Sequence, residues 1–177
     1  IFERLHPSDS ALEIRLARPE DKEEVQAMAE LIGRHQANSP VYAPFFPEEV
    51  SDRRESFARL LSDPDVTFWL AFKDGQALGY QLQVPAETET DNLLIPDSCT
   101  ELAVAATFAH ARGQGVGQAL TRHALVAAQA AGYTYCVTDW RTTNLLSSRF
   151  WPRQGFRPAY YRLRRSIDSR IAWATIR

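Results

Sequence analysis

The chain has little of what marks membrane, secreted or nucleic-acid-binding proteins. It contains no apolar run near the roughly 18 residues that a membrane span requires. The stretch Ile1 to Asp9 is mixed and polar, without a signal-peptide pattern. A formal net charge of −2 argues against a nucleic-acid partner. These absences predict a globular cytoplasmic protein that partners neither a membrane nor a nucleic acid.

Cysteine and histidine are also scarce and scattered. Cys99 and Cys136 are far apart, and each falls in a predicted strand, so we expect buried free thiols in a reducing compartment. The four histidines share no i, i+3 or i, i+4 spacing and no cluster of cysteines accompanies them. We therefore expect no metal site. No serine lies in a G-x-S-x-G motif, which leaves a hydrolase nucleophile without support.

The length and composition of the chain suit one domain. The length of 177 residues, the 45% hydrophobic fraction and the 24% charge are ordinary for a single globular unit. We expect one domain over residues 1–177, with its core over about 13–177. Because the chain begins with Ile1, we also consider that it is one half of a longer, tandem protein.

Apolar residues that recur with period two predict strands, and those that recur with helical spacing predict helices. Asp74-Gly75 predicts a hairpin turn between two of the strands. These patterns predict an α/β fold (α+β in some schemes) whose mixed, mostly antiparallel sheet is flanked by helices, in the order β-α-α-β-β-β-α-β-α-β-β. The predicted strands are 13–17, 67–72, 77–84, 100–107, 133–139, 156–163 and 171–176. The predicted helices are 19–36, one capped by Ser51 that ends at Asp63, 115–131 and 144–153.

A glycine run directly follows the predicted strand 100–107. Arg112 to Gly117 (R-G-Q-G-V-G) opens an alanine-rich amphipathic helix. Glycines leave backbone N–H groups uncovered at a helix N-terminus, where the helix dipole favours a phosphate. The run lacks the G-x-G-x-x-G spacing of dinucleotide sites and the G-K-[ST] of nucleotide triphosphate loops. We therefore expect a phosphorylated ligand of another kind.

The remaining spacing, R-x-x-G-x-G, resembles the acyl-CoA pyrophosphate loop of the GCN5-related N-acetyltransferase (GNAT) family. A second block, Asn144 to Phe156 (N-L-L-S-S-R-F-W-P-R-Q-G-F), is similar to the family pattern N-x-x-A-x-x-aromatic-Tyr-x-x-x-G-F. The resemblance covers roughly residues 67–163. It implies an acyl-CoA N-acyltransferase fold and acetyl-CoA as co-substrate, without a metal.

The resemblance also implies where acetyl-CoA is held. The pantetheine arm would pair with the strand before the glycine run, and small side chains there would let it approach. The implied cofactor-binding residues are Ala105, Ala106, Thr107, Arg112, Gly113, Gln114, Gly115, Val116, Gly117, Gln118, Asn144 and Ser147.

Three residues take the positions of the family's catalytic groups. The N–H of Ala105 resembles the donor to the thioester carbonyl, and Glu101 occupies the position of a catalytic base. Trp151 stands where many members carry a tyrosine that protonates the thiolate, although an indole does not give up its proton near neutral pH. Tyr160 and Tyr161 are alternative hydroxyl donors.

We expect an N-acetyltransferase that works by direct attack of a primary amine in a ternary complex. The aromatic loop with Tyr42, Phe45 and Phe46 and the last two strands would line the acceptor pocket. A small-molecule amine is the first choice of acceptor and a protein amine the second; a homodimer is left open. The alternative is a domain that binds acyl-CoA without turnover, as a sensor or a structural half of a tandem protein.

Overall fold

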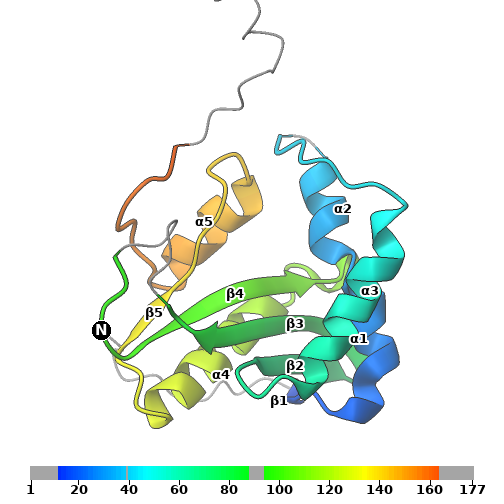
Figure 1. The fold of residues 1–177 in the computed structure, drawn as a ribbon, viewed down its shortest axis with the longest axis horizontal. Helices are drawn as coiled ribbons and strands as arrows, with labels where there is room; N and C mark the ends of the chain where they lie inside the picture. The colour runs from blue at the N-terminus through cyan, green and yellow to red at the C-terminus, as the bar shows by residue number, and fades with distance from the viewer. Residues whose placement is uncertain (1–11, 39, 88–93, 164–177) are drawn as a thin grey trace, which may run out of the picture.

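The computed structural model describes residues 12–38, 40–87 and 94–163 (Figure 1). The strands are β1 (Glu13–Leu16), β2 (Thr67–Lys73), β3 (Gln76–Pro85), β4 (Cys99–Thr107) and β5 (Tyr135–Val137). The α-helices are α1 (Lys22–Met28), α2 (Leu31–Ala37), α3 (Glu49–Arg59), α4 (Val116–Ala130) and α5 (Leu145–Arg153). Short 3-10 turns cover Pro19–Asp21, Leu60–Ser62 and Ala109–Ala111.

The strands form one mixed sheet in the order β1-β2-β3-β4-β5. The first four are antiparallel neighbours, and β5 joins β4 in parallel. A mixed, mostly antiparallel sheet flanked by helices was the predicted fold class, and the structure confirms it. The hairpin at Asp74-Gly75 is also confirmed, with both residues at positive φ.

Helices cover both faces of the sheet. Phe68, Leu70 and Phe72 of β2 pack with α1 and α3 on one face. Trp69 and Ala71, which alternate with them, pack against α4 on the other face. Because successive side chains of a strand point to opposite faces, a strand buried on both sides is apolar at nearly every position.

The expected helix 19–36 is interrupted. A 3-10 turn precedes α1, and α1 ends at Met28 before α2 begins at Leu31. Ala29 and Glu30, between them, keep helical dihedral angles, so the apolar periodicity continues through the break and does not reveal it. The Glu30 carboxylate lies buried and accepts hydrogen bonds from Arg34 and Arg54, which ties α2 to α3.

The expected cap at Ser51 is wrong. The helix α3 begins at Glu49, and Ser51 lies inside it. The N–H groups of Glu49 and Val50 donate to the carbonyls of Phe46 and Pro47, so a backbone turn starts the helix without a side-chain cap. Phe57 of this helix, and Leu60 and Leu61 directly after it, pack on the core.

The expected strand 156–163 is not formed. Gly155, at φ 90°, ends α5, and the chain then runs mostly exposed along the molecule. Pro158 removes one backbone donor that a central strand would need. Arg162 pairs instead with Asp139 at 2.7 Å. The expected last strand, 171–176, lies outside the described residues.

Candidate functional site

The glycine turn lies open. Gly113 and Gly115 have φ of 77° and 81°, a left-handed conformation that side chains rarely adopt. A Cβ built on either residue would meet nothing within 4 Å. Residues 112–115 are all exposed, so the turn does not close on protein atoms as a purely structural turn would.

Uncovered donors line this turn. The helix α4 begins at Val116, and its N-cap Gly115 has no side chain to offer. Among the described residues, the backbone N–H groups of 113–118 find no well-formed backbone acceptor. The first N–H groups of a helix have no partner within it, and the dipole of a helix of this length adds partial positive charge there. The turn can therefore accept an anion such as a phosphate.

Three of the segments expected to bind the cofactor meet at Gly117. A Cβ on this residue would lie 3.4 Å from the Phe150 ring of α5 and 3.9 Å from the Thr107 methyl of β4. The start of α4, the end of β4 and the side of α5 therefore converge. The absence of a side chain at Gly117 is what allows this approach.

A bulge changes which edge of β4 carries free donors. Leu82 pairs with Val104 and Gln83 with Leu102, so Ala103 is an extra residue on β4. Beyond the bulge, the Phe108 N–H donates to the Leu78 carbonyl. Because bonded and unbonded pairs alternate along an antiparallel ladder, Ala105 and Thr107 turn their N–H groups away from β3.

Among the described residues, no strand pairs with the edge of β4 toward which the Ala105 N–H points. The contact between β4 and β5 covers only Cys99, Thr100 and Glu101, after which the two strands separate. The Leu102 carbonyl still accepts the Thr138 hydroxyl at 2.9 Å. Beyond Leu102, no strand of the described residues pairs with this edge of β4, which leads to the glycine turn. An extended ligand can add to such an edge as a strand would.

Glu101 marks the point where the strands part. It is half-buried, pairs with Val84 on one side and Val137 on the other, and shares a sheet face with Val84. Its position beside the split suits the role expected of it, which stays a prediction.

The Asn144 side chain forms hydrogen bonds within the protein. Its side chain is 7% exposed and caps α5 by accepting the Ser147 N–H at 3.3 Å. The same oxygen, Oδ1, lies 3.1 Å from Nε2 of His35 in α2. No local spacing in the sequence points to His35, since 109 positions separate it from Asn144. The expected contact of Asn144 with the cofactor stays a prediction.

Trp151 belongs to the packing of α5. It is 7% exposed, and its ring meets Phe150 and Phe156 edge-on, with centroids 4.8 and 5.4 Å away. Tyr160 and Tyr161 are exposed. The part expected of Trp151 in catalysis is therefore not visible in its surroundings and stays a prediction.

The aromatic loop is anchored at one residue. Phe45 packs on Gly33 of α2, where an added Cβ would lie 2.7 Å from the ring, and Arg53 stacks over it at 5.2 Å. Tyr42 and Phe46 are 70% and 56% exposed. The loop thus presents apolar surface beside α2, which suits the predicted acceptor role without testing it.

Both cysteine thiols are free, as predicted. Burial raises the pKa of Cys99, and it raises the pKa of Cys136 to about 12. Both side chains therefore stay neutral thiols and are poor nucleophiles near neutral pH.

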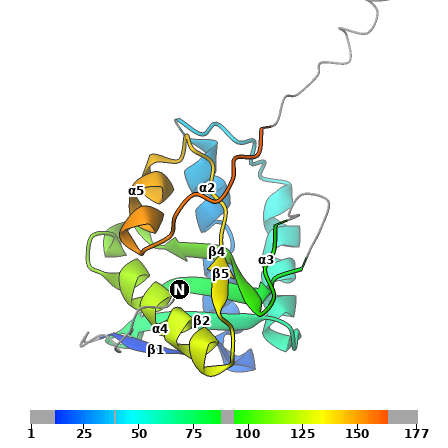
Figure 2. The same cartoon turned by 90° about the vertical axis from the view of Figure 1, so that its left-hand side faces the viewer.

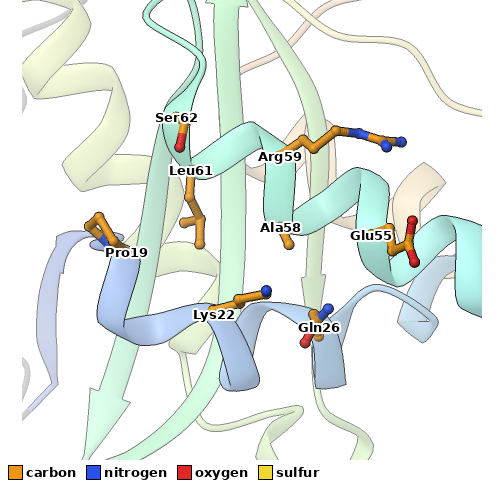
Figure 3. Close-up of a pocket in the computed structure, with 8 residues that line it drawn as sticks. All are labelled: Pro19, Lys22, Gln26, Glu55, Ala58, Arg59, Leu61 and Ser62. Atoms are coloured by element: carbon orange, nitrogen blue, oxygen red, sulfur yellow. The ribbon is translucent and has the colours of Figure 1, made fainter.

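A groove of about 420 Å³ lies elsewhere, between α1 and α3 (Figure 3). Lys22 and Gln26 of α1 and Glu55 and Arg59 of α3 line it. It includes none of the residues expected at the site. Within the described ranges, no group of three His, Cys, Asp or Glu side chains could hold a metal ion. None of the helices there is both long and apolar enough to cross a bilayer.

An open glycine turn at a helix start and a strand pair that separates beside it lie here on a mixed sheet flanked by helices, which is the acyl-CoA N-acyltransferase-like fold. The chain belongs to the acetyltransferase (GNAT) family, whose sequence model matches residues 32–156. The comparison with curated proteins gave no match.

Solved structures share the fold at low sequence identity. The tetramutant of the BH1408 protein from Bacillus halodurans has a TM-score of 0.71 and 15% identity, over 88% of this chain and 99% of that one. The PaiA N-acetyltransferase from Thermoplasma acidophilum, in complex with coenzyme A, has a TM-score of 0.65 and 20% identity, over 82% and 89%. The aminoglycoside acetyltransferase meta-AAC0020 from an uncultured soil metagenomic sample, in complex with sisomicin, has a TM-score of 0.62 and 11% identity, over 89% and 97%.

Proposed function

We propose that this protein transfers the acetyl group of acetyl-CoA to a primary amine by direct attack in a ternary complex. The observation that carries the proposal is the continuous path from the uncovered N–H groups of residues 113–118 to the free edge of β4. Acetyl-CoA, when bound, supplies a thioester that activates the acetyl carbonyl. Its diphosphate fits the open turn, and its pantetheine arm fits the unpaired edge.

The N–H of Ala105 polarises the reacting carbonyl in this proposal. It turns away from β3 toward the unpaired edge, because the bulge at Ala103 shifts the alternation of β4. A donor fixed in this way stabilises the negative charge that develops on the carbonyl oxygen. Such a donor typically contributes about 10²–10³ in rate.

Glu101 takes the proton of the amine. For a lysine-like amine, deprotonation at neutral pH costs roughly 4–5 kcal/mol, against about 1 kcal/mol for an α-amine. A base at the parting of β4 and β5 lowers that cost for the more basic amines.

The acceptor we favour is a small-molecule amine, with a protein amine second. The exposed Tyr42 and Phe46 beside α2 would contact its apolar part. The similarity to an aminoglycoside acetyltransferase and to the PaiA N-acetyltransferase supports an amine acceptor.

A second candidate function is acyl-CoA binding without turnover. Trp151 motivates it, because this residue is buried in aromatic packing and its indole cannot release a proton to the thiolate. The same fold would then serve as a sensor of acyl-CoA.

A thiol-release assay with acetyl-CoA and a panel of small amines, polyamines, aminoglycosides and lysine peptides separates the two. Release of CoA that depends on the amine supports the transferase. Micromolar binding of CoA without release for any amine supports the sensor and contradicts our proposal.

A further inference from the structure

A hydrogen bond of His35 joins helix α2 to helix α5. His35 Nε2 in α2 lies 3.1 Å from Oδ1 of Asn144, the N-cap of α5. Figures 1 and 2 show α2 and α5 on the same side of β4. This bond connects the helix next to the aromatic loop with the helix next to the glycine turn.

The bond fixes which ring nitrogen carries a proton. Asn144 Oδ1 also accepts the Ser147 N–H at 3.3 Å, so the amide oxygen, rather than its nitrogen, faces both donors. His35 Nε2 must therefore donate. Nδ1 is left as the nitrogen that can gain or lose a proton, and the bond to Asn144 holds the ring in one orientation.

Helix α5 relates the position of His35 to that of the glycine turn. This helix meets the glycine turn at Phe150, whose ring reaches Gly117, and it meets His35 at Asn144. The rise from Asn144 to Phe150 is about 9 Å. A ligand whose phosphates lie on the turn and whose arm runs along the free edge of β4 therefore travels toward His35. Helix α2, which carries His35, also contacts β4.

We propose that His35 is the general acid of the transfer and that its Nδ1–H protonates the departing sulfur of CoA. This inference rests on the proposed function and fills the role that Trp151 leaves open. As the amine forms its bond to the acetyl carbon, the C–S bond breaks and its electron pair stays on sulfur. The S–H bond forms with the proton from Nδ1, and His35 remains neutral with its other proton on Nε2.

Two protons leave the acceptor nitrogen in the whole reaction. Glu101 passes the first, lost by the ammonium ion before attack, to water, and the second, lost as the amide forms, also leaves to solvent. Water returns one proton to Nδ1 of His35, so each turnover releases one proton. As a class, an imidazolium is a stronger acid than a thiol, so the transfer of a proton from an imidazolium to a thiolate runs downhill. A tyrosine near 10 would have to donate uphill. An imidazole is thus the better acid for this leaving group, provided that it is protonated.

Several charged groups lie on the elements around His35. The charged groups on these elements include Glu101 on β4, Arg149 and Arg153 on α5, Arg53 and Arg54 on α3, and Arg34 on α2 itself. Arg34 is paired with Glu30 at 2.6 Å. The positive arginines and the negative Glu101 act in opposite directions on a proton at His35.

The first test is NMR on the wild-type protein without ligand. Two-bond ¹H–¹⁵N correlations of the His35 imidazole should show the neutral ring protonated at Nε2. A ring protonated at Nδ1 would overturn the proposal, because the nitrogen facing the sulfur would then have the wrong role. This readout needs neither turnover nor a variant.

The second test compares His35→Gln with His123→Gln. Glutamine can still donate a hydrogen bond to Asn144 but cannot deliver a proton. We expect kcat to fall about 10²-fold in His35→Gln, with the Kd for CoA within threefold of wild type and the fall of kcat at high pH abolished. His123, on α4 against Trp69, is the matched control, and its variant should keep kcat.

Failure of this inference differs from failure of the proposed function. If wild type releases CoA with an amine but His35→Gln retains more than a tenth of its kcat, only the role of His35 is wrong. If His35→Gln instead loses CoA affinity together with turnover, His35 is a structural joint between α2 and α5, which also overturns the proposal. If wild type releases no CoA with any amine, the proposed transferase itself falls.

Discussion

The proposed cofactor side and the proposed acceptor side of this site are built by different means. The cofactor side, comprising β4, the glycine turn and α4, is continuous in the chain, and backbone geometry creates its binding groups. The proposed acceptor side, comprising α2 and the aromatic loop, is assembled from side chains such as Glu30, Phe45 and His35 that make contacts across long sequence separations.

The difference has consequences for what substitutions do. Backbone donors depend on conformation, so a change acts by blocking or straining the turn rather than by deleting a functional group. Side-chain contacts can be removed one at a time. We therefore expect large, all-or-none effects on the cofactor side and graded, separable effects on the acceptor side.

Substitution of Gly115 by glutamate should have the largest effect. The side chain would enter the open space at the turn, strain a residue at φ 81° and place a negative charge among the uncovered N–H groups. We expect the Kd for CoA, measured by calorimetry, to rise at least 10³-fold. Gly75→Glu is the matched control, since Gly75 has φ 76° and equally open surroundings in the β2–β3 hairpin. Equal CoA affinity of the two variants would contradict the assignment of the turn.

Glu101→Gln should have the second-largest effect, and it should act on turnover. Loss of a general base typically costs about 10²-fold or more, so kcat should fall by that factor with a lysine-like amine and much less with an α-amine. The acid limb of the kcat/KM profile should disappear. The exposed Glu23→Gln serves as control. A pH profile that stays unchanged in Glu101→Gln would show that another group takes the proton.

Glu30→Ala should change the KM for the amine without changing the affinity for CoA. It removes a buried carboxylate that Arg34 and Arg54 bind, and we expect about 2 kcal/mol lower unfolding free energy because the two arginines are largely exposed. The KM for the amine should rise while CoA affinity stays within threefold. Glu49→Ala, which removes an exposed pair with Arg53 at 3.8 Å, should cost less than about 1 kcal/mol. A loss of CoA affinity in Glu30→Ala would mean that the two sides are not independent.

The pH dependence of stability should be the smallest effect. Burial lowers the pKa of His123, so the unfolded chain binds its proton more readily, and stability is lost as pH falls below the ordinary histidine value of about 6.5. His123→Gln should flatten this part of a denaturation profile.

Two carboxylates govern a separate, more acidic window. The Arg15 guanidinium lowers the pKa of Asp21; for Glu30, burial opposes but the bonds from Arg34 and Arg54 outweigh it and lower the pKa. Their contribution to the free energy of unfolding is present above the ordinary carboxyl pKa values near 4 and is lost below them.

The two windows can be told apart. If the wild-type protein loses no stability between neutral pH and pH 5, the assignment of His123 is contradicted.

The sequence was informative where structure is local. The alternation of β2 and the glycine spacing of 112–117 are short patterns whose physical causes act within a few residues, and the elements they predict are present. The break at Ala29 and Glu30 stayed hidden because both residues keep helical angles. The bond between His35 and Asn144 depends on tertiary packing, which no local spacing encodes. The strand expected over 156–163 failed because apolar alternation does not ensure a neighbouring edge to pair with.

The most direct test of the account is a titration of the ¹⁵N-labelled protein with CoA, followed through the amide resonances of Gly113, Gly115 and Gly117. We predict that these amides shift together and saturably, and that the amide of Ala105 shifts with them. Binding of CoA that leaves the glycine amides unmoved would contradict the claim that uncovered N–H groups at the start of α4 hold the diphosphate.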